Sequence, residues 1–391
     1  MGEAYIVAAR RTAGGRRKGR LRGWHPAALA ARVLEDLVAQ TGIDPALIED
    51  VIMGCVSQGG EQSTQVGRNA ILASSLPDSI PAVTIDRQCG SSQQAVQFAA
   101  QAVMSGTQDI VIAAGVESMT RVPMGSPVTL YKEAGIGTGP YPDAVEARYG
   151  TRNISQFIGA EMIAEKHGFS KERMDAFALE SHRRAAAATR AGAFRAEIIP
   201  LQGLDETGDP VLHDTDEGIR YDATPESIAA VRPLTEKNLI TAATASQMCD
   251  GASGVMVVSE RALKAHGLVP LARIHSFCVT AGDPVIMLEE PLRATDVALE
   301  RAGMSLGEID LFEVNEAFAS VPMAWLKHTG ADPDKLNVNG GAIALGHPLG
   351  GTGTKLMSTL IHTLRARGER YGMQAMCEGG GIANVTILEA L

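Results

Sequence analysis

The chain has 391 residues and a formal net charge of −10, with 45% hydrophobic and 20% charged residues. This composition is typical of a soluble globular protein of two or three domains. The negative charge argues against nucleic acid or an anionic membrane surface as the main partner. The sequence also has no apolar run long enough to span a bilayer.

The first third of the sequence alternates strand-like and helix-like segments. Short apolar runs predict strands, and segments with helical periodicity bounded by Pro or Gly predict helices. The expected strands are 4–9, 48–56, 82–89 and 109–115, and the expected helices are 25–42, 64–74 and 91–106. This alternation predicts an α/β fold with a largely parallel sheet.

The last third repeats that order of elements. A helix over 289–303 precedes a strand within 307–319, a strand, turn and long helix over 336–368, and a strand pair over 371–391. Although the two thirds share little sequence identity, the repeated order predicts two similar βα halves that arose by duplication.

The segment between the halves has a different character. Residues 119–247 carry clusters of Pro, Gly and Asp around two predicted helices, 154–168 and 171–192. We expect an inserted loop domain that folds over the sheet edge and covers an active site. The predicted domains are 1–118 with 248–270, then 119–247, then 271–391.

Five cysteines without a CxxC pair argue against a disulfide framework or a zinc ribbon, and they favour a reducing cytoplasm. The start of the sequence lacks the apolar region of a signal peptide, and no metal site is predicted. A basic cluster stands out in this acidic chain. It predicts either a solvated loop or a contact with an anionic ligand or another subunit. Its members are Arg10, Arg11, Arg16, Arg17, Lys18, Arg20 and Arg22.

Cys89 lies in "DRQCGSSQQAV", where a predicted strand ends and a helix begins. The N-terminal amides and the dipole of a helix stabilise a thiolate, so we expect Cys89 to have a lowered pKa and to act as a nucleophile. The alternative is a cysteine that is simply buried at a turn.

The segment "NVNGGAIALGHPLGGTG" places His347 just before the helix that corresponds to the Cys89 helix in the other half. If the halves pack with pseudo-twofold symmetry, His347 lies near Cys89 and serves as its base. The alternatives are a loop histidine with its hydrogen bonds satisfied or a phosphate loop, although the spacing does not match a Walker sequence.

Two further motifs complete the candidate site. In "MCEGGGIAN", Cys377 precedes three glycines whose amides could hold an oxyanion, and a thiol there can act as an acid or base. In "EVNEAFA", Asn315 and Glu316 lie at a strand end, and Asn315 either holds a water or orients an imidazole, or is a helix cap. Two thiols, a histidine and an asparagine suit cleavage or formation of carbon–carbon bonds in acyl thioesters.

At these residues the chain resembles the thiolase family, the acetyl-CoA acyltransferases and 3-ketoacyl-CoA thiolases, over essentially its whole length. The motifs "CGSSQQAV", "NEAFA", "NVNGGAIALGHPLGGTG" and "MCEGGG" occur in family order and spacing. The resemblance implies duplicated βα domains in a five-layer α-β-α-β-α sandwich with an inserted loop domain. It also implies a homodimer or homotetramer that uses coenzyme A as a substrate and needs no cofactor.

The resemblance also implies a role for each matching residue. Cys89 is acylated, His347 activates it, and Cys377 moves the α-proton. Asn315 with His347 forms one oxyanion hole, and the amides of Cys89 and Gly379 form the other. Three residues match contacts of the acyl-CoA: Arg220 and Ser246 for coenzyme A, and Met287 at the acyl group.

One segment departs from part of the family. Relatives that prefer acetoacetyl-CoA carry a His-Met-Gly sequence where this chain reads "NISQFIGAEMIAEKHG". Here we expect Ser155 to cap the helix and Phe157, Ile158, Met162 and Ile163 to form an apolar face. This face either packs on the sheet or lines the acyl end of the cleft, where it favours medium or longer acyl chains. An acetoacetyl-CoA-forming acetyltransferase is the alternative. A decarboxylating ketosynthase, a non-catalytic acyl-CoA or lipid carrier and a cysteine hydrolase are weaker ones.

Overall fold

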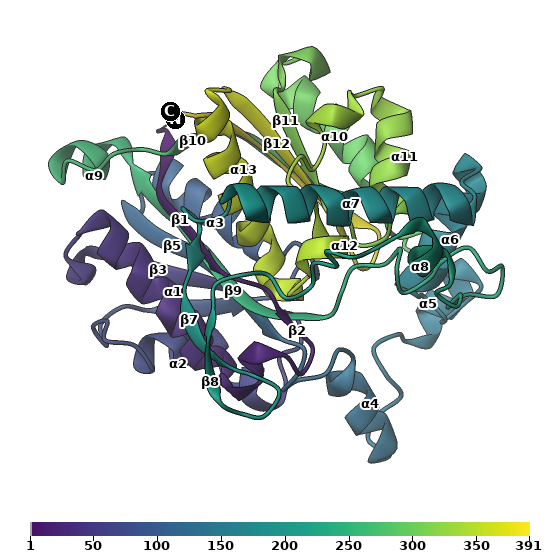
Figure 1. Cartoon of the computed structure of the whole chain (residues 1–391). Helices are drawn as coiled ribbons and strands as arrows, with labels where there is room; N and C mark the ends of the chain where they lie inside the picture. The colour runs from purple at the N-terminus through teal and green to yellow at the C-terminus, as the bar shows by residue number, and fades with distance from the viewer. Residues whose placement is uncertain (1) are drawn as a thin grey trace.

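The computed structural model describes residues 2–391, and nine of the thirteen strands in these residues form one hydrogen-bonded path across the molecule (Figure 1). The order along this path is β11-β12-β13-β10-β1-β9-β5-β3-β4. The strands of the first half are β1 (Ala4–Thr12), β3 (Asp50–Gly54), β4 (Ala82–Ile85), β5 (Ile110–Ser118) and β9 (Cys249–Ser259). Those of the second half are β10 (Ala272–Ala281), β11 (Leu311–Val314), β12 (Tyr371–Glu378) and β13 (Ile382–Ala390).

The expectation of a largely parallel sheet is wrong, because each half is mixed. Parallel pairs join β3 to β4, β3 to β5 and β11 to β12. However, β9 pairs antiparallel with both β1 and β5, and β13 pairs antiparallel with both β10 and β12. The β12–β13 connection is a short glycine turn, which can join only antiparallel strands. The alternation of elements along the sequence could not reveal this, since β9 and β10 pair with strands far away in the chain.

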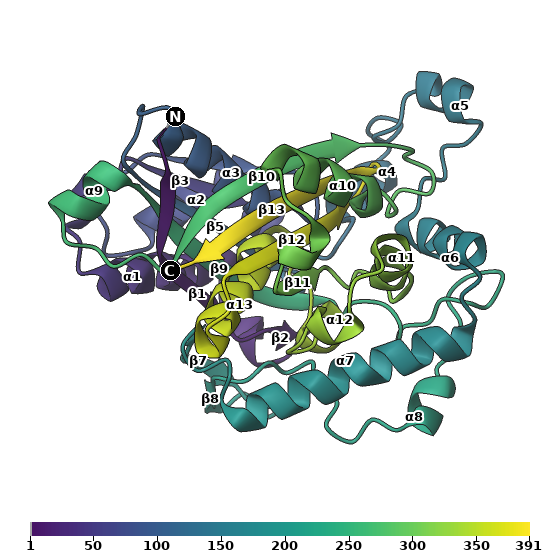
Figure 2. The same ribbon diagram turned by 90° about the horizontal axis from the view of Figure 1, so that it is seen from above.

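Helices cover and separate the two halves of the sheet. In the first half, α1 (Pro26–Thr41) and α2 (Val66–Leu72) pack on the outer face, and in the second half α10 (Pro291–Ala302) and α11 (Ser320–Thr329) do so. Between the halves, α3 (Ser91–Met104) packs on α13 (Thr352–Arg367), with apolar residues of both helices in one buried cluster. The resulting layers are those of an α-β-α-β-α sandwich (Figure 2).

The stretch between β5 and β9 contains the elements that cover one side of this body. Its helices are α4 (Ser126–Glu133), α5 (Asp143–Tyr149), α6 (Gln156–His167), α7 (Lys171–Ala191) and α8 (Pro225–Ala229). Its strands are β6 (Ile198–Ile199), β7 (Leu201–Leu204) and β8 (Pro210–His213). Figure 2 shows α7 running along one side of the molecule past the short α12 (Ala342–Leu345). Two smaller elements complete the chain, β2 (Gly15–Arg16) and α9 (Glu260–Ala265).

Within residues 2–391, no helix is both long enough and apolar enough to cross a bilayer.

Candidate active site

Cys89 is presented by a tight turn between β4 and α3. Gln88 takes a left-handed backbone conformation, with φ of 48°. The Ser91 hydroxyl holds this turn, because it accepts from the Arg87 amide at 2.9 Å and donates to the Gln88 carbonyl at 2.6 Å. The turn places Cys89 just before the first turn of α3, with 6% of its surface exposed.

The expectation of a lowered pKa at Cys89 is wrong for the enzyme without substrate. Burial raises the pKa of the Cys89 thiol well above its ordinary value, and negative charge on Cys377 and Glu378 would raise it further. The helix N-terminus favours a thiolate by about 1 kcal/mol, which is small beside the desolvation of a fully buried anion. Cys89 is therefore a neutral thiol that must lose its proton to a base as it attacks.

His347 can act as that base. Its Nδ1 lies 2.6 Å from the Thr352 hydroxyl, and this hydroxyl donates its proton to the Pro348 carbonyl at 2.9 Å. Nδ1 must then be the donor, which leaves Nε2 with a free lone pair. Nε2 makes no hydrogen bond within residues 2–391. Burial, with a smaller effect from the Lys355 charge, lowers the pKa of His347 to about 3, so the ring is neutral.

Buried polar groups fix the loop that carries His347. The His347 amide donates to the Gln247 carbonyl at 3.0 Å, and the Lys355 ammonium donates to the Gly346 carbonyl at 2.9 Å. On the far side of the loop, the Glu117 carboxylate accepts from the Gly350 amide at 2.9 Å. These three contacts come from separate parts of the chain, so the loop is held from several directions.

Cys377 and Asn315 lie at the ends of adjacent parallel strands, β12 and β11. Cys377 is fully buried, and burial followed by the Glu378 charge raises its pKa to about 12, which the nearby Asn315 side chain partly offsets. Both side-chain polar atoms of Asn315 lack a hydrogen bond of normal geometry to any described residue. An unpaired buried amide beside a thiol is suited to bind a water or a substrate oxygen.

The structure brings the motifs of Cys89, His347 and Cys377 together near the N-termini of α3 and α13. The Thr354 amide donates to the Ser92 hydroxyl at 3.0 Å, and a Cβ atom on Gly353 would overlap the Gln93 amide. Only glycine permits this approach of the two helices. Cys89 packs in one buried cluster with Leu349, two residues after His347, and with Met376, next to Cys377.

Gly379, two residues after Cys377, lies next to the turn that carries Cys89. A Cβ atom on Gly379 would lie 2.9 Å from Oε1 of Gln88, the residue that precedes Cys89. The glycine turn and the Cys89 turn are therefore in contact, and Gly379 is only half-buried, so its backbone can approach a ligand.

The residues predicted to contact acyl-CoA occupy different positions around this site. The Ser246 amide donates to the Ala317 carbonyl at 2.9 Å, which places Ser246 beside the Asn315 loop. Met287 has a positive φ of 56° and is buried in the apolar cluster that includes Cys377 and α6. Arg220 lies farther out, with an exposed side chain and a backbone amide bonded to His182 of α7 at 3.2 Å.

The face predicted for α6 is divided in the structure. Ile163 is fully buried in the core, whereas Ile158 is 38% exposed, and Phe157 packs edge-to-face on Phe318 with ring centroids 5.2 Å apart. Phe157 and Ile158 line a cavity of about 590 Å³ together with Met162. Ser155 occupies the N-cap position but its side chain makes no capping hydrogen bond.

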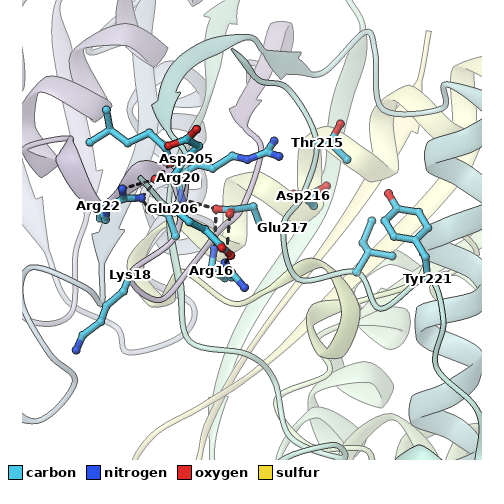
Figure 3. Close-up of a pocket in the computed structure, with 13 residues that line it drawn as sticks. Arg16, Lys18, Arg20, Arg22, Asp205, Glu206, Thr215, Asp216, Glu217 and Tyr221 are labelled. Carbon is cyan, nitrogen blue, oxygen red and sulfur yellow. Dashed lines mark hydrogen bonds and ion pairs between the residues drawn. The ribbon is translucent and has the colours of Figure 1, made fainter. Parts of the chain in front are cut away.

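Three members of the basic cluster near the N-terminus, Arg10, Arg11 and Arg16, have acidic partners within the described residues. Arg11 is fully buried, with Glu197 at 2.6 Å and Asp216 at 2.8 Å, and Arg16 lies 3.1 Å from Glu206. A cavity of about 750 Å³ beside this segment is lined by equal numbers of basic and acidic residues (Figure 3). These are Arg16, Lys18, Arg20 and Arg22 against Asp205, Glu206, Asp216 and Glu217. The balance of charge argues against an anion site, and the cluster fastens the N-terminal segment to residues 197–217.

Sequence reasoning missed several residues that shape the site. Thr352 sets the tautomer of His347, and Asn337 holds the end of β11 through its side chain, which accepts from the Val314 amide and donates to the Val314 carbonyl, both at 2.9 Å. Both lie inside the quoted glycine-rich motif, which is the only signal that could have found them. Glu117, by contrast, ends a predicted apolar strand without any motif around it.

The family comparisons agree with this geometry. Residues 4–261 match the family model described as the thiolase N-terminal domain, and residues 268–390 match that of the thiolase C-terminal domain. The chain is similar to a steroid 3-ketoacyl-CoA thiolase of Mycobacterium tuberculosis, with 51% identity over 100% of this chain and 95% of the relative. It is also similar to a 3-ketoacyl-CoA thiolase of Serratia proteamaculans, with 41% identity over the full length of both.

Solved structures give the same result. An acetyl-CoA acetyltransferase of Bacillus anthracis superposes with a TM-score of 0.91 at 35% identity, covering 100% of this chain and 99% of the other. Human mitochondrial 3-ketoacyl-CoA thiolase superposes with a TM-score of 0.89 at 34% identity and the same coverage. Both sequence and fold match over the whole length, and the chain therefore belongs to the thiolase family of acyltransferases.

Proposed function

We propose that this thiolase works through an acyl-enzyme on Cys89, with His347 as the base and Cys377 as the acid that moves the substrate proton. The observation that carries the proposal is the free Nε2 of a neutral, oriented His347 in a site with two buried thiols. A cysteine hydrolase would need only one of these thiols.

In the first half-reaction, the Cys89 sulfur attacks the 3-keto carbon of a 3-ketoacyl-CoA and its proton passes to His347 Nε2. The bond between C2 and C3 breaks, and Cys377 gives its proton to C2 of the departing acetyl-CoA enolate. A carbon protonated in this way needs an acid held beside it, which the position of Cys377 at the end of β12 provides. The products are acetyl-CoA and an acyl thioester on Cys89.

In the second half-reaction, the thiol of free coenzyme A gives its proton to the Cys377 thiolate and attacks this thioester, and the protonated His347 returns its proton to the departing Cys89 sulfur. Asn315, through a water, and His347 Nε2 stabilise the oxygen charge in one step, and the amides of Cys89 and Gly379 do so in the other. The unpaired amide of Asn315 supports the first assignment, and the contact of the Gly379 turn with Gln88 supports the second.

For the substrate, we propose medium, longer or ring-bearing 3-ketoacyl-CoA in the degradative direction. The 51% identity to a steroid 3-ketoacyl-CoA thiolase supports an extended acyl group. The α6 cavity offers the apolar side chains of Phe157, Ile158 and Met162 to such a group, although charged residues also line it, namely Glu161, Glu165, Glu236 and Lys237. An acetoacetyl-CoA-forming activity is the second candidate, because an acetyl-CoA acetyltransferase shares the fold closely.

Further proposals concern binding and assembly. Arg220 and Ser246 are proposed to contact coenzyme A, and Met287 the acyl group, as their positions around the site allow. A homodimer or homotetramer is supported by exposed apolar side chains on α4, where Leu130 and Tyr131 are 61% and 59% exposed. We propose a cytoplasmic location, which the five free, buried cysteines support.

The proposal is tested by thiolysis kinetics on 3-ketoacyl-CoA of four, eight and twelve carbons and on one ring-bearing substrate. Each buried methylene contributes about 0.8 kcal/mol, so kcat/KM should rise about tenfold or more from four to eight carbons. A clear preference for the four-carbon substrate would support the acetoacetyl alternative. Transfer of the acyl group to water instead of coenzyme A would contradict the proposed function.

A further inference from the structure

Glu378 stands between Cys377 and Gly379 in the chain, at the end of β12. Successive side chains of a strand point to opposite faces, so Glu378 points away from the side that Cys377 faces. Its side chain is fully buried, and a Cβ atom on Gly90 would overlap its Oε1. The carboxyl group therefore lies directly against the first turn of the helix that follows Cys89.

Side-chain amides make most of the other polar contacts between α3 and the β12–β13 hairpin, and Gln374 Oε1 is the atom among them that has no partner within the described residues. Gln374 Nε2 donates to Gln93 Oε1 at 2.8 Å and to the Gly353 carbonyl at 2.9 Å, and Gln93 Nε2 donates to the Thr386 hydroxyl at 3.0 Å. This seam of side chains holds the nucleophile helix to the strand that carries Cys377.

Glu378 lies at the end of the seam nearest the thiols. In the part of the chain that the structure describes, neither of its oxygens makes a hydrogen bond of normal geometry. The same holds for both amide atoms of Asn384 on β13 and for Arg87 Nε in the turn before Cys89. A buried carboxylate without partners is strongly disfavoured, so the uncharged acid is the stable form at neutral pH.

The groups around Glu378 agree with this assignment. Burial raises the pKa of Glu378 to about 8, Asn384 and the Arg87 charge act in the opposite direction, and the Asp86 charge adds to the rise. A negative charge on Glu378 in turn raises the pKa of Cys377, after burial, and that of Cys89, after burial and Cys377 itself. The charged groups that act on the carboxyl are thus Asp86 and Arg87, and the carboxyl in turn acts on the two thiols.

We propose that Glu378 is a positioning residue of the two-thiol site, whose uncharged acid form lets the thiolates of Cys89 and Cys377 develop and whose carboxylate form opposes them. The inference rests on the proposed two-thiol function, but it concerns the reactivity of the thiols themselves. It therefore applies to the enzyme without any substrate.

The consequence for pH has a definite sign. Below about pH 8 Glu378 is uncharged, and the rate at which Cys89 reacts rises tenfold per pH unit, as for any thiol below its own pKa. Above about pH 8 Glu378 ionises, and its negative charge raises the pKa of Cys89. The alkylation rate of Cys89 therefore rises less steeply with pH. An uncharged isostere at position 378 removes this second phase.

The experiment measures the alkylation rate of Cys89 by iodoacetamide in the full-length protein from pH 6.5 to 10, with the modified peptide quantified by mass spectrometry. The variants are Glu378→Gln, Glu378→Asp and the control Glu389→Gln. Glu389 lies at the far end of the same hairpin, paired with Arg273 at 2.5 Å and with Arg370 at 2.5 Å. Thiolysis is recorded in parallel over the same pH range.

We expect Glu378→Gln to react within about twofold of wild type at pH 6.5 and about threefold faster or more at pH 9. Glu378→Asp keeps the charge and should keep the shallower rise, and Glu389→Gln should match wild type. Identical profiles for wild type and Glu378→Gln would overturn the proposal, as would an equal effect of Glu389→Gln. If Glu378→Gln does not fold, the pH profile of wild type alone tests the proposal. An alkylation rate of Cys89 that rises tenfold per pH unit all the way to pH 10 would contradict an ionising Glu378. A wild type that lacks thiolysis but keeps the two-phase alkylation would refute the proposed function and not this inference.

Discussion

At the scale of single residues, the site consists of uncharged groups placed where charge develops during the reaction. Burial keeps Cys89 and Cys377 as thiols and His347 as a neutral ring, and no charge partner compensates the desolvation of these groups. The resting site is therefore close to neutral, and in the proposed mechanism the Cys89 proton is transferred as the sulfur attacks the 3-keto carbon of the bound substrate.

The first prediction concerns the relative reactivity of the cysteines. Cys89 is 6% exposed, whereas the other four cysteines are exposed by 2% or less, so Cys89 should be alkylated first despite its raised pKa. His347→Asn removes the base and should slow this alkylation by about tenfold or more. Peptide mapping after brief iodoacetamide treatment measures both effects, and faster modification of Cys249 or Cys278 would refute the assignment of the nucleophile.

The second prediction is a pH-dependent loss of stability from His347. Its folded pKa of about 3 is below the ordinary value of 6.5, so the unfolded chain takes up a proton first as the pH falls. The stabilisation is present above pH 6.5 and declines below it, by about 1.4 kcal/mol at pH 5.5. Denaturant unfolding at pH 7.5 and 5.5 should show this extra loss in wild type relative to His347→Asn. The same loss in both proteins would contradict it, and the exposed His266→Asn is the control.

At the scale of elements, the start of α13 supplies the group that orients the base. Thr352 is its first residue, and its hydroxyl holds His347 Nδ1. Thr352→Val keeps the shape but removes the acceptor, so kcat should fall by about tenfold to a hundredfold, while Thr352→Ser should recover most of it. Thiolysis kinetics with a melting curve for each variant check this, and unchanged kcat in Thr352→Val would contradict the tautomer assignment.

The elements also show what the sequence can and cannot predict. Helices α1, α3 and α7 follow the expected ranges closely, because Pro, Gly and an apolar periodicity mark them. The roles that the motifs indicate for the site residues stay predictions. The partners of β9 and β10 could not be predicted, since an apolar strand carries no information on which strand it pairs with. The prediction of a lowered pKa for Cys89 was wrong. A helix N-terminus can be recognised in a sequence, whereas the burial that raises the pKa by more than the helix lowers it cannot.

At the scale of the whole molecule, the site exists only where the two halves meet. Cys89 comes from the first half and His347, Cys377 and Asn315 from the second, and the two helices α3 and α13 hold them in register. Within the inserted segment, Ser246 and α6 lie beside the second half, whereas residues 197–217 bond to the N-terminal segment of the first half. Substrate range can therefore change in the insertion without altering the catalytic residues.

The central claim is that the two thiols have different tasks, and one mass-spectrometric measurement tests it directly. Cys89→Ser and Cys377→Ser are each incubated with acetyl-CoA, and acetylation of the protein and exchange of the acetyl protons with deuterated water are recorded. The account predicts that Cys89→Ser forms no stable acyl-enzyme. Cys377→Ser should acquire one acetyl group on Cys89 but lose α-proton exchange and carbon–carbon cleavage by about a hundredfold or more. A Cys377→Ser enzyme with near-normal exchange and cleavage would contradict it.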